Sequence, residues 1–149
     1  MVDYNLICEQ AEALSEGVDW EITVLANVSA LLYDTLEKLN WAGFYLMRGG
    51  ALELGPFQGK PACTRIPVGK GVCGTAVKED RIQRVEDVHA FPGHIACDGA
   101  SASEIVLPIH VNGEILGVLD IDSPVKGRFS EEDERGLTKL VKVIEKCLE

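Results

Sequence analysis

The chain has 149 residues, the size of a single domain with a substantial hydrophobic core. Its formal net charge of −10 at pH 7 argues against nucleic acid or an anionic membrane as the main partner, because both are negatively charged. No apolar run approaches membrane-spanning length and no basic residue precedes the first apolar stretch, so we expect neither a membrane segment nor a signal peptide.

Apolar residues recur at helical spacing over residues 2–16 and along one face of residues 19–39, which predicts two N-terminal helices. The period then changes to two. This change predicts strands over residues 41–47 and 51–56, joined by a turn at residues 48–50.

The middle of the chain has shorter predicted elements. Residues 64–68 and 81–85 are strand candidates, and residues 72–79 form a short helix entered through glycines. A long segment rich in Gly, Pro, Ser and Ala follows over residues 91–104, a composition typical of a loop. Because loops on a rigid scaffold often carry reactive groups, Cys97 in this segment is a candidate reactive residue.

A hairpin and a helix complete the chain. Asn112-Gly113 supplies the positive φ angles of a tight turn between strands over residues 105–111 and 114–123. Ser130 and the acidic residues after it form a capping-box pattern that begins a C-terminal helix. No βαβ alternation is present, so we expect an α+β domain, an antiparallel sheet with helices on one side. Without a repeat or linker, residues 1–149 are predicted to form one domain.

Five cysteines without an export signal indicate a reducing, cytoplasmic location, where cysteines are more often packed, catalytic or metal-bound than bridged. Cys63, Cys73, His94 and Cys97 could supply a Cys₃His zinc site. Neither Cys63 nor Cys73 belongs to a C-x-x-C pair, so we do not expect a metal. Residues 69–74 match the G-x-G-x-x-G pattern of dinucleotide sites, but that pattern needs a parallel βαβ unit, and we interpret the match as chance.

Asp120 and Asp122 share one face of a predicted strand whose other face is apolar. Buried carboxylates are unfavourable unless they are paired, so this pattern suggests a site. The alternative is that the strand runs out into solvent before Pro124, and the pattern alone favours neither interpretation.

Six segments together resemble the free methionine-(R)-sulfoxide reductases, which are single-domain GAF proteins. They are residues 40–45, 55–63, 71–76, 91–98, 103–106 and 117–123. The similarity runs in register from about Trp20 to the final helix, and the segment around Cys97 is highly specific to that family. Cys8 and Cys147 lie outside the pattern, and we expect both to be packed between helices.

The resemblance implies an enzyme that reduces free methionine-(R)-sulfoxide without a bound cofactor. Cys97 would be the nucleophile, Cys63 the thiol that resolves it, and Cys73 an auxiliary thiol. The family's substrate pocket corresponds to Trp41, Tyr45, Glu104, Asp120 and Asp122. The resemblance also implies recycling by thioredoxin and a homodimer. The alternative from another class is a GAF module that binds a small ligand without turnover, with dispensable cysteines.

The chemistry of sulfoxide reduction assigns tasks to these residues. Thiolate attack on sulfur leaves a sulfenic acid, which a second thiol converts to a disulfide. The carboxylates would supply the proton, and their crowding should raise the pKa of at least one of them. The ammonium of a free amino acid would balance the others. Trp41 and Tyr45, four residues apart on one strand, would enclose the methyl and sulfur end.

A shared pocket places a demand on the C-terminal hairpin. A two-residue turn at Asn112-Gly113 would put Glu104 on the opposite face from both aspartates. A three-residue loop would set Glu104 across from Asp120, and a bulge near Pro108 would have a similar effect, since proline in sheets is confined to edges, strand starts and bulges. We therefore expect a longer loop or a bulge, with the carboxylates converging on Cys97.

Overall fold

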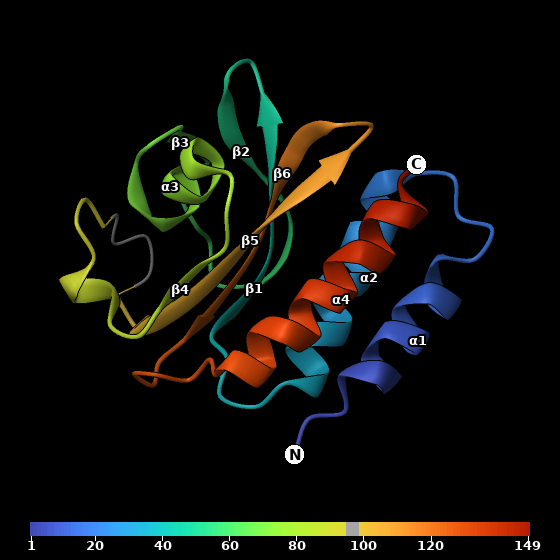
Figure 1. The fold of residues 1–149 in the computed structure, drawn as a ribbon, viewed down its shortest axis with the longest axis horizontal. Coiled ribbons are helices and arrows are strands. Elements are labelled where there is room, and N and C mark those ends of the chain that lie inside the picture. The colour runs from blue at the N-terminus through green and yellow to red at the C-terminus, as the bar shows by residue number, and fades with distance from the viewer. Residues whose placement is uncertain (95–98) are drawn as a thin grey trace.

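The computed structural model describes residues 1–94 and 99–149, which form a six-stranded antiparallel sheet with helices on both faces (Figure 1). The strands lie in the order β3-β2-β1-β6-β5-β4. In chain order the elements are α1 (Tyr4–Ser15), α2 (Glu21–Thr35), β1 (Trp41–Arg48), β2 (Ala51–Gly59), β3 (Arg65–Pro67), α3 (Gly71–Glu79), β4 (Gln83–Val85), the 3₁₀ helix η1 (Val88–Ala90), β5 (Ser103–Val111), β6 (Glu114–Ser123) and α4 (Glu131–Cys147). The predicted α+β class is confirmed. None of the helices in these ranges is long and apolar enough to cross a membrane.

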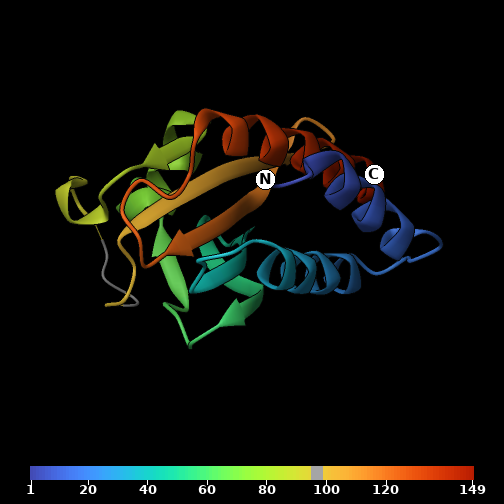
Figure 2. The same ribbon diagram turned by 90° about the horizontal axis from the view of Figure 1, so that it is seen from below.

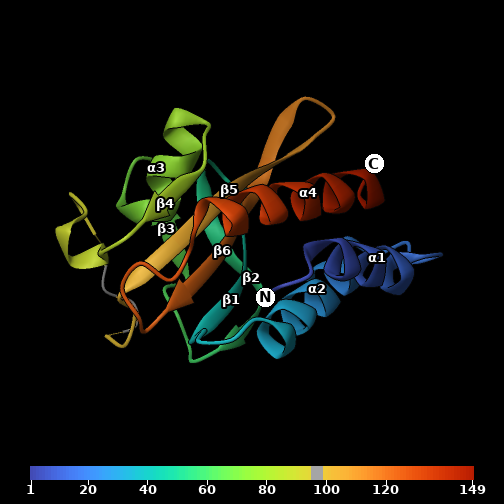
Figure 3. The same ribbon diagram turned by 60° about the horizontal axis from the view of Figure 1, so that its bottom comes forward.

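Helices cover both faces of the sheet. On one face α2 contacts β1 and β2, α4 contacts β5, and α1 packs beside α2 and α4 (Figures 2 and 3). On the other face α3 contacts β5 and β6. The prediction that all helices lie on one side is therefore wrong for α3. Its Val72 and Ala76 pack with Val106 and Val118 in a second apolar cluster, separate from the main core.

The helix boundaries follow local chemistry. The Ser130 Oγ accepts a hydrogen bond from the Asp133 N–H at 3.2 Å, and the Asp133 Oδ2 accepts one from the Ser130 N–H at 2.9 Å, so α4 begins at the predicted capping box. The second helix ends at Thr35, earlier than predicted, because Leu36 adopts extended backbone angles. Leu36 and Leu39 still pack on the core, which explains why the apolar period continues past the helix end.

A bulge in the β5–β6 hairpin sets the register of the acidic residues. Asn112 and Gly113 form a two-residue turn with φ angles of 53° and 81°, so the alternative of a three-residue loop is wrong. The pairing then shifts, because Leu116 in β6 is an extra residue between two successive pairs. This is the bulge that the sequence predicted near Pro108, and it returns Glu104 to the face that carries the two aspartates.

Candidate active site

A pocket of about 50 Å³ lies on the face of the sheet that α3 covers. Its volume exceeds several-fold the roughly 10–15 Å³ that one water molecule requires by the same measure. Among the residues proposed from the sequence, those that line it are Trp41, Tyr45, Cys73, Glu104, Asp120 and Asp122. The pocket also has lining side chains that were not assigned to it from the sequence: Ala62, Ile66, Lys70, Val72, His94 and Ser101.

Strand pairing brings the three carboxylates together. Glu104 of β5 pairs with Asp122 of β6, and Asp120 lies two residues away on the same face of β6. The three-residue loop would have set Glu104 opposite Asp120; it pairs instead with Asp122, two residues further along, because the extra residue lies in β6. The convergence itself is confirmed, and Glu104 and Asp120 are only 7% and 5% exposed.

The pKa values of two of these carboxyl groups are raised. Burial, followed by repulsion from Asp120 and Asp122, raises the pKa of Glu104 well above its ordinary value. Burial also raises the pKa of Asp120, but hydrogen bonds from Glu104 and from Cys73 oppose that rise. Burial therefore favours the protonated form of Glu104, which can donate a hydrogen bond to the aspartates. A protonated carboxyl in a pocket is a potential general acid.

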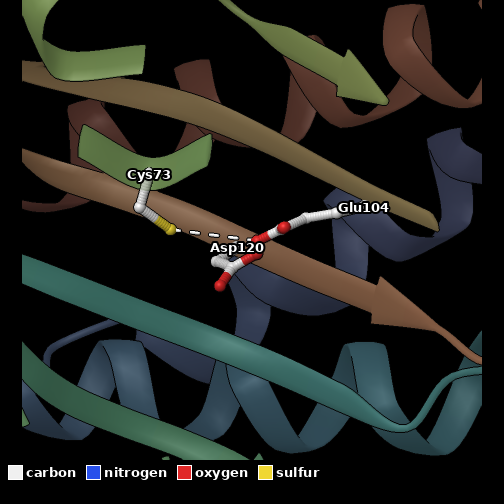
Figure 4. A group of neighbouring side chains, drawn as sticks. All are labelled: Cys73, Glu104 and Asp120. Atoms are coloured by element: carbon white, nitrogen blue, oxygen red, sulfur yellow. Dashed lines mark hydrogen bonds between the residues drawn. The ribbon is translucent and has the colours of Figure 1, made fainter. Parts of the chain in front are cut away.

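Cys73 lies within this acidic group (Figure 4). It is carried by α3, and its Sγ donates a long hydrogen bond to the Glu104 Oε2 at 3.9 Å. Burial, with the nearby negative charge of Asp120 and Glu104, raises the pKa of the Cys73 thiol well above its ordinary value. Cys73 is therefore held as a thiol, which is a poor nucleophile.

Aromatic rings form one wall of the pocket. The ring centroids of Trp41 and Tyr45 are 5.7 Å apart, and Phe57 of β2 also stacks on Trp41, with a centroid distance of 5.1 Å. The Tyr45 hydroxyl donates a hydrogen bond to the backbone carbonyl of Cys63 at 2.9 Å. Gly43 permits this arrangement, because a Cβ at that position would lie 2.6 Å from the Phe57 Cα.

The N-terminus of α3 lies at the pocket. Gly69 and Gly71 have φ angles of 89° and 61°, which other residues rarely adopt. Lys70, the N-cap residue, and Gly71 both line the pocket. The strands on either side, β3 and β4, pair antiparallel with their neighbours, so the G-x-G-x-x-G match does not lie in a parallel βαβ unit.

The remaining cysteines differ in state. Cys63 is disulfide-bonded, whereas Cys8, Cys73 and Cys147 are free. Cys97 falls within residues 95–98, outside the described part of the chain, so its role as nucleophile stays a prediction, as does the convergence of the carboxylates on it. The alternative zinc set includes Cys97 and is likewise untested. Within the described ranges, the group that could hold a metal ion is Cys73, Glu104 and Asp120.

Comparison with known proteins agrees with this geometry. The GAF domain family matches residues 19–148. The free methionine-R-sulfoxide reductase of Escherichia coli (strain K12) is 62% identical over 136 residues, which cover 91% of this chain and 82% of that protein. These matches span nearly the whole chain.

Solved structures extend the likeness to three dimensions. The fRMsr of Staphylococcus aureus in its reduced form superposes with a TM-score of 0.97 at 54% identity, covering 100% of this chain and 97% of that one. The free methionine-R-sulfoxide reductase from Neisseria meningitidis, in complex with its substrate, gives a TM-score of 0.94 at 40% identity, covering 99% and 92% of the two chains.

Proposed function

Since the chain belongs to the free methionine-R-sulfoxide reductase family of GAF-domain proteins, we propose that it reduces the R epimer of free methionine sulfoxide to methionine. The observation that carries the proposal is the pocket in which Glu104, Asp120 and Asp122 share one face with a Trp41–Tyr45 wall. Acidic groups suit the polar end of a free amino acid. The aromatic wall suits its methyl and sulfur end.

The reductive step uses Cys97 as a thiolate. Its sulfur attacks the sulfoxide sulfur, the sulfur–oxygen bond breaks, and the oxygen passes to Cys97 as a sulfenic acid while methionine leaves. Two electrons move from the cysteine to the substrate. The step consumes one proton, which makes the departing oxygen a better leaving group.

Glu104 is the proton donor in this proposal. Its raised pKa keeps a proton on the carboxyl at pH values where an exposed glutamate is ionised. Asp120 and Asp122 accept hydrogen bonds from it and orient it toward the pocket. Their negative charge also favours a substrate ammonium, which a methionine within a peptide lacks.

Cys63 resolves the sulfenic acid. Its thiol condenses with the sulfenic acid of Cys97, water leaves, and a disulfide forms. The disulfide-bonded state of Cys63 supports this role, and so does the Tyr45 hydrogen bond that holds its backbone beside the pocket. Thioredoxin would then reduce the disulfide by thiol exchange. Cys73, a buried thiol, is at most an auxiliary reductant.

The family membership also supports the wider setting. We infer that residues 1–149 act as one GAF domain, as a homodimer, in the reducing cytoplasm and without a bound cofactor. The free thiols of Cys8, Cys73 and Cys147 are consistent with a reducing compartment.

The test is methionine release from each free sulfoxide epimer with thioredoxin, thioredoxin reductase and NADPH present. We expect turnover of the R epimer and none of the S epimer. Cys63→Ser should keep the first turnover and lose thioredoxin-dependent cycling. Tight reversible binding without product from either epimer would instead favour a ligand-sensing GAF module.

A further inference from the structure

Cys73, Glu104 and Asp120 form a buried cluster of atoms that can bind a metal (Figure 4). One sulfur and two carboxylate oxygens, one from each residue, lie within 4.8 Å of one another, and all three residues are buried. Ligand atoms around a tetrahedral zinc lie roughly 3.3–3.8 Å apart, given zinc–ligand bonds of about 2.0–2.3 Å. Side-chain shifts of about 1 Å would therefore close this cluster around an ion.

A second observation favours a cation at this cluster. The Asp120 Oδ1 is buried and has no hydrogen-bond partner among the described residues, although Asp120 lines the pocket. A buried carboxylate oxygen without a partner is unfavourable. A substrate ammonium would remove that penalty during turnover. A metal ion would remove it in the absence of substrate.

We propose that a thiophilic divalent cation, Zn²⁺ or Cd²⁺, binds Cys73, Glu104 and Asp120 in the empty pocket and excludes the substrate. Thiolate favours these ions over Mg²⁺ and Ca²⁺, which prefer oxygen ligands alone. Three protein ligands leave a fourth position for water or for a ligand in the pocket. The proposal uses the proposed function only in naming free methionine, the product, as the competitor.

Metal binding releases protons at this site. The Cys73 S–H bond breaks, a sulfur–metal bond forms, and the proton passes to solvent. The Cys73 thiol and the Glu104 carboxyl must each be deprotonated to bind the ion, so protons compete with the metal. Binding should therefore weaken as pH falls. Metal binding should also release protons to the solvent, whichever buffer is used.

The experiment titrates Cd²⁺ into the protein with the Cys63 disulfide intact, so that the described free thiols are Cys8, Cys73 and Cys147. Thiolate-to-cadmium charge-transfer absorption in the ultraviolet reports sulfur coordination, and calorimetry gives the affinity. We expect one equivalent to bind with the absorption. Cys73→Ser should remove the absorption and weaken binding at least tenfold. Cys8→Ser, a matched control on α1, should change neither.

Asp120→Asn keeps the thiol and should also weaken Cd²⁺ binding at least tenfold, which tests the site even if Cys73→Ser fails to fold. Unchanged affinity in both variants would overturn the proposal. Free methionine should raise the apparent Kd for Cd²⁺ in proportion to its concentration. Methionine that binds the metal-free protein but leaves Cd²⁺ binding unchanged contradicts the shared pocket. Methionine that does not bind the metal-free protein contradicts the proposed function, and the variants then decide the metal site alone.

Discussion

Replacing Glu104 with glutamine should stabilise the protein while it impairs catalysis. The pKa of Glu104 is raised well above its ordinary value of 4.5 by burial and by two neighbouring aspartates. A carboxyl with a raised pKa binds more protons in the folded state, so its contribution to stability falls as pH rises above about 4.5. Glutamine keeps the shape and the hydrogen-bonding capacity without a titrating proton.

The effect arises because the folded protein keeps the Glu104 carboxyl protonated at a pH where the unfolded chain ionises it. Single stabilising substitutions commonly contribute about 0.5–2 kcal/mol, and we expect Glu104→Gln to fall in that range. For a protein of this length, 1 kcal/mol corresponds to roughly 2–4 °C in Tm, so we expect a rise of about 1–8 °C at pH 7.5. The rise should vanish near pH 4, where both forms are neutral. The same variant should lose at least tenfold in kcat/KM, about 1.4 kcal/mol of transition-state stabilisation.

Differential scanning calorimetry between pH 4 and pH 8 measures this, alongside steady-state methionine release. Glu114→Gln is the matched control, because Glu114 is exposed at the start of the same strand as the aspartates. It should change neither Tm nor activity measurably. A Glu104→Gln protein that is less stable than wild type at pH 7.5, or equally stabilised at both pH extremes, would refute the reasoning.

Three further predictions concern the same fold. Asp122→Asn should lower kcat/KM at least tenfold, about 1.4 kcal/mol, with little change in far-ultraviolet circular dichroism. Gly43→Ala should lower stability in urea denaturation by about 1–3 kcal/mol, because its Cβ would lie 2.6 Å from the Phe57 Cα. Tyr4→Phe removes a 2.6 Å hydrogen bond to Asp133 and should reduce stability at pH 7 by about 1–2 kcal/mol. Partial burial raises the pKa of Asp133, but its hydrogen bonds outweigh that effect and lower the pKa overall. The stability difference between wild type and Tyr4→Phe should therefore have its full size above about pH 4 and shrink as pH falls below 3.8.

The sequence predicts the hairpin better than its register. Asn112-Gly113 has a local turn preference strong enough to identify from two residues, and its two-residue geometry is confirmed. The need to bring Glu104 to the aspartates, together with Pro108, predicts a bulge. Local chemistry does not say which strand carries the extra residue, because the packing of both faces decides that. The extra residue lies in β6, at Leu116, so Glu104 pairs with Asp122.

Most of the pocket residues that the sequence missed lie outside helices and strands; the exceptions are Ile66 in β3 and Val72 in α3. His94 and Ser101 lie in the loop between η1 and β5, and Lys70 precedes α3, so no periodic pattern links them to the sheet. The placement of α3 was missed for a related reason. A nine-residue helix with three glycine or alanine positions shows too weak an apolar stripe to indicate which face of the sheet it covers.

Single-turnover methionine release by the reduced protein tests the central claim most directly, because it needs no external reductant. Wild type mixed with excess free methionine-(R)-sulfoxide should release methionine in a rapid burst of about one equivalent as the Cys63 disulfide forms. Cys97→Ser should release none, whereas Cys8→Ser should match wild type. A substantial burst from Cys97→Ser would contradict the account, since another group would then be reducing the sulfoxide.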